Sequence, residues 1–408
     1  MGRIFSMYGG LRKEIYILCF GRFVTAMGSL IWPMLTLIFK SKLGFNAEEV
    51  ATWMLLFGAI QLPFALVGGK MTDRYNKRNL IVIFDLISVV LSVIVAILPL
   101  TVYSICIYFI SSVFQHMEWP AYDALIAELT TDKDREKAYS LQYLASNLGV
   151  VFAPTLGGLL FNHYLWLAFL ITGLAVLSST IFIFFFIPEK IEAEKNTNHY
   201  EEEKTGTLME VLKGRSLLVF FIVLSCLITI IYGQFNYLLP MQMDLFFLEQ
   251  GAFYFGLITS INGLVVITCT PILTGWTLKW NDISRIILGE LLQIVGLFAC
   301  FFYTDQLICY VITMIVFTLG EVMITLGNSP YISKRIPSSH RGRFTSAHNI
   351  YKQASSSISN TFFGKLVVLF SFKAGWTAVG ILGCITLTLL VVYKRLDKIY
   401  FRMLYEKE

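Results

Sequence analysis

The stretch GGKMTDRYNKRN, residues 68–79, stands between two long runs of apolar residues. It places five charged side chains within nine residues, at Lys70, Asp73, Arg74, Lys77 and Arg78. Only 14% of the 408-residue chain is charged, whereas soluble proteins are about 25% charged. Such a cluster is either a solvated turn between two buried helices or a functional element at the end of a pair of membrane helices. The rest of the sequence distinguishes the two.

Apolar runs follow one another along the whole chain. Hydrophobic residues make up 56% of it, its mean hydropathy is +0.68, and runs of about 20 apolar residues can cross a bilayer as helices. A soluble protein could not hide so much apolar surface from water, and the alternating polarity of a membrane barrel does not appear. We therefore predict an all-α integral membrane protein with twelve transmembrane helices, at residues 14–39, 47–69, 79–98, 102–126, 140–161, 164–187, 216–239, 252–274, 283–303, 306–327, 345–368 and 373–394.

The basic residues between these runs predict the orientation of the chain, because Lys and Arg gather in short cytoplasmic loops. An even number of spans puts both termini on one side. That side receives nearly all the basic loop residues, and the other side has only Lys40, Lys42 and Lys373. We expect cytoplasmic termini in a multi-pass protein of the cell (plasma) membrane. The net charge of +5 then reflects orientation and requires no nucleic-acid partner.

The sequence contains no motif typical of an enzyme or a metal site, and its cysteines are scattered. The seven cysteines lie within the predicted spans without any CxxC pair, which is typical of small apolar side chains in helices and not of a disulfide or metal framework. No P-loop, HExxH motif or nucleophile elbow occurs. We expect neither an enzyme nor an ATP-driven pump, and no cofactor.

The chain divides into two halves of similar design. One long polar stretch predicts a cytoplasmic linker over 188–215, between six-helix bundles at 1–187 and 216–394, with a cytoplasmic tail at 395–408. The halves match weakly at offsets of 205 to 210 residues, as in Gly69 with Gly275, Asp85 with Glu290, Pro120 with Pro330, Arg135 with Arg343 and Tyr143 with Tyr351. A duplicated unit with its axis along the membrane normal is a known design of secondary transporters.

Two motifs resemble signatures of one transporter family. GGKMTDRYNKR, residues 68–78, fits the Gly-x-x-x-Asp-Arg-x-x-(Lys/Arg)-(Lys/Arg) signature that the major facilitator superfamily carries between spans 2 and 3. GVVFAPTLGG, residues 149–158, resembles the antiporter motif of that superfamily at Gly149, Pro154, Gly157 and Gly158, with Ala153 in place of one glycine. The resemblance implies two pseudo-symmetric six-helix bundles around a central cavity, and it points to the twelve-span drug:proton antiporters.

One departure from the family pattern concerns span 4. The arginine that the family usually carries there is missing, and Ser111 or Ser112 stands at its place. A proton mechanism that relies on this arginine must therefore run differently in this chain.

The opening stretch is interpreted as a conformational latch. Gly68 and Gly69 would let span 2 end tightly against a neighbouring helix, and Asp73 could face a helix N-terminus, where a negative charge is favoured. The resemblance implies that such contacts lock the outward-facing state, and the predicted set is Gly69, Asp73, Arg74, Arg78 and Asp123, with Asp123 as an acid for Arg74 or Arg78. The alternative, positive-inside charge alone, explains Lys77 and Arg78 but leaves Asp73 unexplained.

Charged residues inside membrane spans are costly and therefore indicate function. Arg22 stands eight residues after Glu14, and Glu118 stands ten residues before Glu128 on a helix of opposite direction. Both thus lie at a similar depth from one face, at about 1.5 Å of rise per residue. The resemblance implies that spans 1, 4, 7 and 10 line the cavity, where Arg22 and Glu118 could meet. They would form either a fixed ion pair or a site where Glu118 carries a proton or meets a cationic substrate, because a buried carboxyl group can exchange its proton for a cation.

Further candidates are spread over other spans. Glu321 in span 10 is a proton or substrate site or an inert neutral acid, with Lys352 as a conceivable partner, and His116 could join a proton relay. Asp85 and Glu290 lie near the cytoplasmic face, where we expect them to pair with loop cations. The polar residues on the presumed cavity helices either contact substrate or hold helices together; these are Gln115, Gln234, Asn236 and Asn328.

These features predict a proton-coupled antiporter that exports small amphipathic compounds or drugs by alternating access, as in multidrug efflux and antibiotic resistance. Its expected partners are a small-molecule substrate, protons and membrane lipids, and we expect a monomer. One alternative is an exporter or importer of a dedicated metabolite, peptide or glycolipid, in which Arg22 would bind an anionic group. Another is a non-transporting membrane sensor or assembly factor, which should have lost the latch and the embedded acids.

Overall fold

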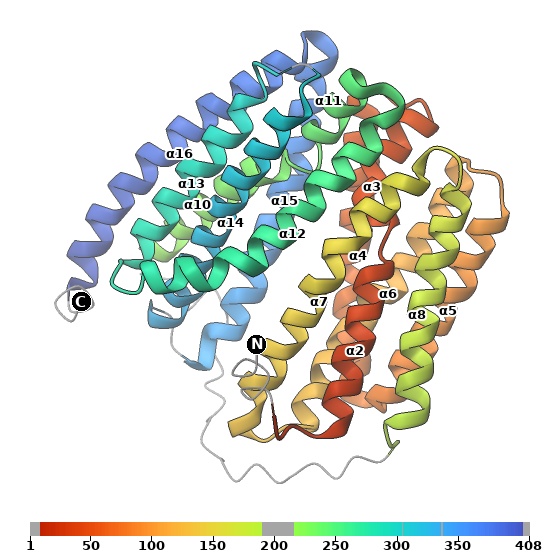
Figure 1. Ribbon diagram of the computed structural model, residues 1–408. Coiled ribbons are helices and arrows are strands. Elements are labelled where there is room, and N and C mark those ends of the chain that lie inside the picture. Colours follow the sequence, from red (N-terminus) through yellow and green to blue (C-terminus); the bar gives the residue numbers. More distant parts are fainter. Residues whose placement is uncertain (1–8, 190–215, 304, 336–337, 403–408) are drawn as a thin grey trace. The chain divides into compact units, whose positions relative to one another are not determined.

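The computed structural model describes residues 9–189, 216–303, 305–335 and 338–402. Every regular element in these residues is a helix, so the predicted helical class is confirmed (Figure 1). The predicted linker at 188–215 falls almost wholly outside the described residues.

The described chain forms two compact units. The first contains residues 1–44, 59–199 and 252–263, and the second contains 45–58, 200–251 and 264–408. They differ from the predicted halves at 45–58, which includes the first residues of helix α4 (Ala47–Arg74), and at 252–263, which lies in the first half of helix α12 (Gly251–Trp276). The extent of the two bundles across a membrane stays a prediction.

The first unit is built mainly from helices of the N-terminal half, of which α4 contributes only its residues from 59 onward. They are α2 (Lys13–Gly28), α3 (Ile31–Leu37), the short π-helix η1 (Ile38–Lys42), α4 (Ala47–Arg74), α5 (Lys77–Ile97), α6 (Val102–Glu128), α7 (Asp132–Phe161) and α8 (Leu165–Phe186). Side chains cap the N-termini of α5 and α6. Asn76 accepts a hydrogen bond from the backbone N–H of Asn79 at 3.1 Å, and Thr101 forms a capping box with Ser104. Such caps satisfy backbone groups that a helix start leaves unpaired.

The second unit is built from helices of the C-terminal half. They are α10 (Ser216–Gly233), α11 (Leu238–Phe247), the 3-10 turn η2 (Leu248–Gln250), α12 (Gly251–Trp276), α13 (Asp282–Ala299), α14 (Leu307–Arg335), α15 (Ser338–Leu369) and α16 (Phe372–Tyr400). Helix α16 runs beyond residue 394, so the first residues of the predicted tail continue this helix.

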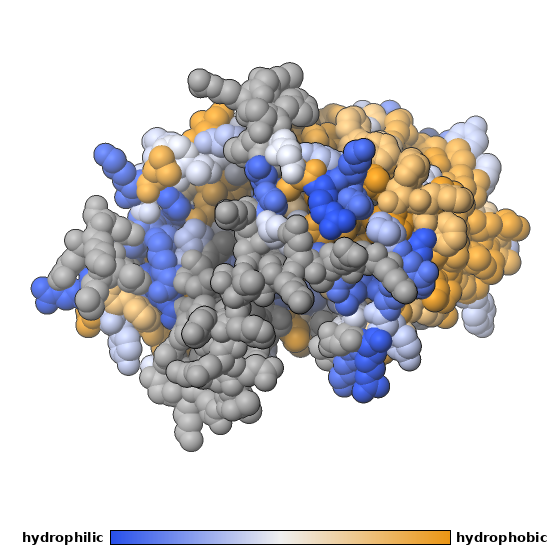
Figure 2. All heavy atoms as spheres, turned by 90° about the horizontal axis from the view of Figure 1, so that it is seen from below, coloured by the Kyte–Doolittle hydropathy of each residue, from blue (hydrophilic) through white to orange (hydrophobic). Residues whose placement is uncertain are grey.

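Seven helical stretches among the described residues are long and apolar enough to cross a membrane. One of them, Ser216–Trp276, contains α10, α11 and α12 together, whereas α13 and α15 carry too many charged or polar residues to qualify by composition. The count of twelve spans therefore stays a prediction. On the face seen from below, hydrophilic side chains gather in patches and hydrophobic side chains cover the flank beside them (Figure 2), as expected of helices that end at a membrane surface.

Candidate functional site

A buried ion pair joins α2 and α6 in the first unit. Arg22 Nη2 lies 3.9 Å from Glu118 Oε1, and their side chains are 16% and 6% exposed. The Arg22 guanidinium also lies 4.0 Å from the centre of the Tyr122 ring, and Tyr122 donates a hydrogen bond to the backbone carbonyl of Leu18. The structure thus brings together the two charges that the sequence placed at equal depth.

A third charged residue, Asp85 of α5, belongs to this cluster. Its Oδ2 accepts a hydrogen bond from Thr180 Oγ1 of α8 at 2.8 Å, and its side chain is buried. Asp85 interacts electrostatically with both Glu118 and Arg22. The expectation that Asp85 pairs with loop cations is wrong, because the rotation of α5 turns this residue toward α6 and α8.

Hydroxyl and amide groups lie between α5 and α6, one to two helical turns away from Asp85 and Glu118. Gln115 Nε2 donates to Ser88 Oγ at 2.7 Å, and the Ser111 hydroxyl lies 2.8 Å from that of Ser88 and 3.1 Å from that of Ser92. Ser111, which stands in the region of the missing arginine, is fully buried. Gln115 therefore holds helices together here, which was one of its two predicted roles.

His116 makes local contacts on its own helix. Its Nδ1 lies 2.8 Å from the backbone carbonyl oxygen of Ser112, and its ring packs against Trp119 with 4.7 Å between ring centres. Ser112 in turn accepts a hydrogen bond from Gln61 of α4 at 3.1 Å. These contacts match an ordinary hydrogen-bonded helix histidine.

The opening stretch ends α4 and begins α5. A Cβ atom on Gly68 would lie 2.5 Å from the backbone oxygen of Met117, so only glycine permits this approach to α6, whereas a Cβ on Gly69 would meet nothing within 4 Å. Arg74 is exposed, and Arg78 donates a hydrogen bond to the backbone carbonyl of Phe184. The side chain of Asp73 lies outside the described residues.

The acid expected to complete the latch has a different partner. Asp123 is exposed and accepts a 3.4 Å hydrogen bond from Gln142. Among the described side chains, no ion pair joins Asp123 to Arg74 or Arg78. Lys77 is the cation of the opening stretch that pairs with α6, and its Nζ lies 2.6 Å from Glu128 Oε1.

The glycine motif of α7 allows close helix packing on two sides. A Cβ on Gly149 or Gly157 would lie 2.6 Å from the backbone oxygen of Phe23 or Leu30, respectively. On the other side, a Cβ on Gly158 would lie 2.5 Å from the backbone oxygen of Ala252, in the part of α12 that belongs to the first unit.

Pro154 lies on that same α12 side of α7. Its backbone oxygen lies against Gly256, and Thr155 Oγ1 lies 2.7 Å from Ser260 Oγ. The motif thus joins α7 to α12 through backbone contact that larger side chains would prevent.

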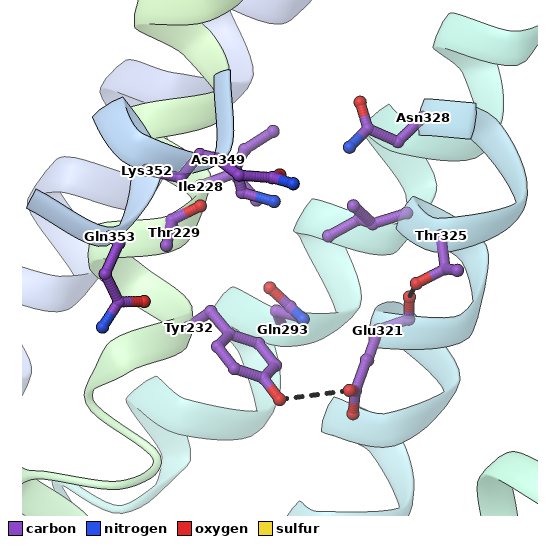
Figure 3. Close-up of a pocket in the computed structure, with 11 residues that line it drawn as sticks. Ile228, Thr229, Tyr232, Gln293, Glu321, Thr325, Asn328, Asn349, Lys352 and Gln353 are labelled. Atoms are coloured by element: carbon purple, nitrogen blue, oxygen red, sulfur yellow. Dashed lines mark hydrogen bonds between the residues drawn. The ribbon is translucent and has the colours of Figure 1, made fainter. Parts of the chain in front are cut away.

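The second unit contains a pocket of about 470 Å³ lined by polar residues of four helices. Glu321 of α14 lies at one end, where its Oε1 accepts a hydrogen bond from Tyr232 of α10 at 3.1 Å (Figure 3). Asn328, Asn349 and Lys352 lie toward the other end of the view. The structure thus places Glu321, Lys352 and Asn328 around one pocket.

Two other predicted contact residues lie elsewhere. Gln234 is fully buried, and its Nε2 donates to Asn360 Oδ1 at 3.3 Å and to the backbone oxygen of Ile230 at 3.0 Å. Asn236 is exposed in the turn between α10 and α11. Neither lines the pocket.

A buried charge network was not anticipated from the sequence. Arg335, at the end of α14, pairs with Asp397 of α16 at 2.6 Å and with Asp282 of α13 at 3.4 Å, and the three side chains are at most 2% exposed. Tyr331 donates to Asp397 Oδ1 at 3.3 Å. The repeat gives no signal for this network, because Asp282 lies seven residues after Gly275 whereas Arg74 lies five residues after Gly69.

Glu290 contradicts its predicted pairing with loop cations. Its side chain is fully buried in α13, and neither carboxyl oxygen has a hydrogen-bond partner among the described residues. One turn away, the side-chain oxygen of Gln293 is also buried without a partner, and Gln293 lines the pocket.

Known proteins resemble the chain over most of its length. The sequence profile of the Major Facilitator Superfamily matches residues 18–360. A Na(+), Li(+), K(+)/H(+) antiporter of Planococcus maritimus is 24% identical, over 79% of this chain and 81% of the relative. The tetracycline resistance protein, class H, of Pasteurella multocida is 20% identical, over 70% and 72%.

Solved transporter structures share the fold. A peptide transporter POT in complex with sulfate has a TM-score of 0.80 at 14% identity, covering 97% of this chain and 96% of that one. The nucleoside transporter NupG has a TM-score of 0.72 at 13% identity, covering 95% and 100%. At such identities the likeness concerns the fold alone.

Proposed function

The chain belongs to the major facilitator superfamily, and we propose that it is a proton-coupled antiporter that exports small amphipathic, cationic compounds by alternating access. The observation that carries the proposal is the Arg22–Glu118 pair, buried between α2 and α6. A charge at that depth is costly, and a carboxyl group beside a cation can change its protonation when its surroundings change. Glu118 would bind the proton that enters in exchange for the exported compound, and Arg22 would set when this proton leaves.

The pocket of the second unit is the proposed substrate site. Its volume of about 470 Å³ falls within the range of about 300–1,000 Å³ that is typical of small-molecule sites. Glu321 offers a carboxylate to a cationic group, the Tyr232 ring offers an aromatic face, and Asn328 offers an amide. This combination favours an amine-bearing compound with an apolar body.

A second candidate function is exchange of monovalent metal cations for protons. It is favoured by the buried cluster of the first unit, in which Asp85 adds a second acid beside a single arginine. It is also consistent with the relative from Planococcus maritimus, which is a Na(+), Li(+), K(+)/H(+) antiporter. In this case the acids of the first unit would themselves receive the cation.

One experiment tests both functions. The full chain is reconstituted into vesicles with a pH-sensitive dye inside, and sodium, potassium or one of a panel of amphipathic amines, including tetracycline, is added outside. Proton movement that follows an organic compound supports drug export, and movement that follows a metal cation supports the second function. Vesicles that move no proton with any of these while transporting a compound down its gradient would contradict proton coupling.

A further inference from the structure

Three charged side chains from three helices meet inside the first unit, and their charges do not balance. Arg22 of α2 carries one positive charge, whereas Asp85 of α5 and Glu118 of α6 can carry two negative charges. With both acids ionised, the cluster would carry a net charge of one minus two, or −1. An uncompensated charge in a buried site costs several kcal/mol, so the balanced state contains one bound proton.

The described side chains around the cluster offer no second cation. The groups that interact electrostatically with the three residues are Cys19 of α2 and Tyr122 and Asp123 of α6. None of them is basic. Thr180 of α8, which contacts Asp85, is a neutral hydroxyl donor. Among the described residues, Arg22 is therefore the one cation that faces either acid.

We infer that Asp85 and Glu118 share a single proton beside Arg22 and together form a one-proton site in the first unit. This inference deepens the proposed function and rests on it, because it assigns to two residues the proton that antiport requires. Two coupled acids release their protons as a pair and not as independent groups. When the proton passes from a carboxyl oxygen to water, both acids are carboxylates and the cluster needs a compensating cation.

The shared proton makes an unusual prediction about substitutions. Replacing either acid by its amide leaves one carboxylate opposite Arg22, which is balanced without any proton. Both Asp85→Asn and Glu118→Gln should therefore lose the cluster's protonated carboxyl group. Arg22→Gln should have the opposite effect, because two acids without a cation each need a proton.

Infrared difference spectroscopy on the purified full chain in detergent, at neutral pH, measures these protons through the carbonyl stretch of the protonated carboxyl group. We expect one such band to be lost in Asp85→Asn and in Glu118→Gln, and a second band to appear in Arg22→Gln. If Asp85→Asn keeps the band that Glu118→Gln loses, Glu118 alone holds the proton and the inference is wrong.

Two controls keep this test decisive. Glu290→Gln changes another buried acid, on α13, and should leave the cluster's band in place. If Asp85→Asn does not fold, Asp85→Glu retains an acid, and it should shift the band when the proton is shared and leave it unchanged when it is not. The infrared spectrum does not depend on transport. If the spectrum shows a shared proton but the vesicles move no protons, the antiport proposal is wrong and the shared-proton inference still holds.

Discussion

We expect Glu118→Gln to abolish export driven by a pH gradient while the protein stays folded. The amide resembles a permanently protonated acid, so the variant cannot release a proton. Exchange of substrate across vesicles without a gradient should survive, because alternating access itself needs no proton release in this variant.

The structure indicates that Glu118→Gln lowers the folding stability only a little. The Arg22–Glu118 distance of 3.9 Å is longer than a hydrogen bond. Two unit charges at that distance attract by about 4 kcal/mol at an effective dielectric constant near 20. Asp85 remains close to Arg22 and retains part of this attraction. We therefore expect Glu118→Gln to lower the free energy of unfolding by about 1 kcal/mol, near the centre of the range for single substitutions.

The competing interpretation, a fixed ion pair without a transport role, predicts a different pattern. Breaking a buried pair from one side costs about 3–5 kcal/mol, so Arg22→Ala and Glu118→Ala would each lose folded protein. Their combination would partly restore it. Folded yield is measured by gel filtration and thermal unfolding, beside export of the compound that the wild-type chain transports, from vesicles with and without a pH gradient.

The control for this series is Glu14→Gln, the same change at a half-buried acid near the start of α2, where Glu14 pairs with Arg12 at 3.3 Å. It should alter neither folded yield nor export. Gradient-driven export at wild-type rates by Glu118→Gln would refute the reasoning, and Glu321 would become the next candidate for the proton site.

The remaining predictions concern topology, the latch, helix packing and the pocket. A cysteine placed at Asn198 should react with a membrane-impermeant reagent only after the cells are opened, and labelling of intact cells would refute cytoplasmic termini. Asp73→Asn should leave insertion and folding intact but cut transport heavily, and unchanged transport would make Asp73 a mere surface charge. Gly149→Leu should destabilise the protein by about 1–3 kcal/mol through overpacking against α2, whereas its control Gly69→Leu, which faces open space, should change thermal unfolding little. Glu321→Gln should weaken binding of a cationic compound at least tenfold while leaving a neutral analogue unaffected, as measured by calorimetry; equal losses for both would remove Glu321 from the substrate site.

Some contacts of the candidate site follow from the sequence because they depend on depth alone. Each helical residue advances about 1.5 Å along the axis, so counting from the ends of two spans placed Arg22 level with Glu118. The close approach at Gly68 was expected as well, but the same reasoning wrongly expected one at Gly69, where a Cβ would meet nothing within 4 Å. Family motifs added the expectation that these spans share a cavity.

Other contacts depend on how each helix is rotated about its axis, which counting does not reveal. Asp85 was expected to face loop cations, but packing of α5 turns it into the Arg22 cluster. Gln234 had two predicted roles, contact with substrate or holding helices together, and it bonds Asn360 inside the helix packing. Each residue turns about 100° from the last, so a small change in rotation moves a side chain from one neighbour to another.

The sequence by itself determined the helical membrane class, because only buried or lipid-facing helices can accommodate so many apolar runs. It also determined the depth of the charged residues within those runs. The tertiary structure alone decided which charges meet: it joined Arg335 to Asp397, which stands 62 positions later in the chain, and left Glu290 without a hydrogen-bond partner among the described residues. The physical reason is that the hydropathy of a segment depends only on its own residues, whereas the partner of a charge depends on how several helices pack together.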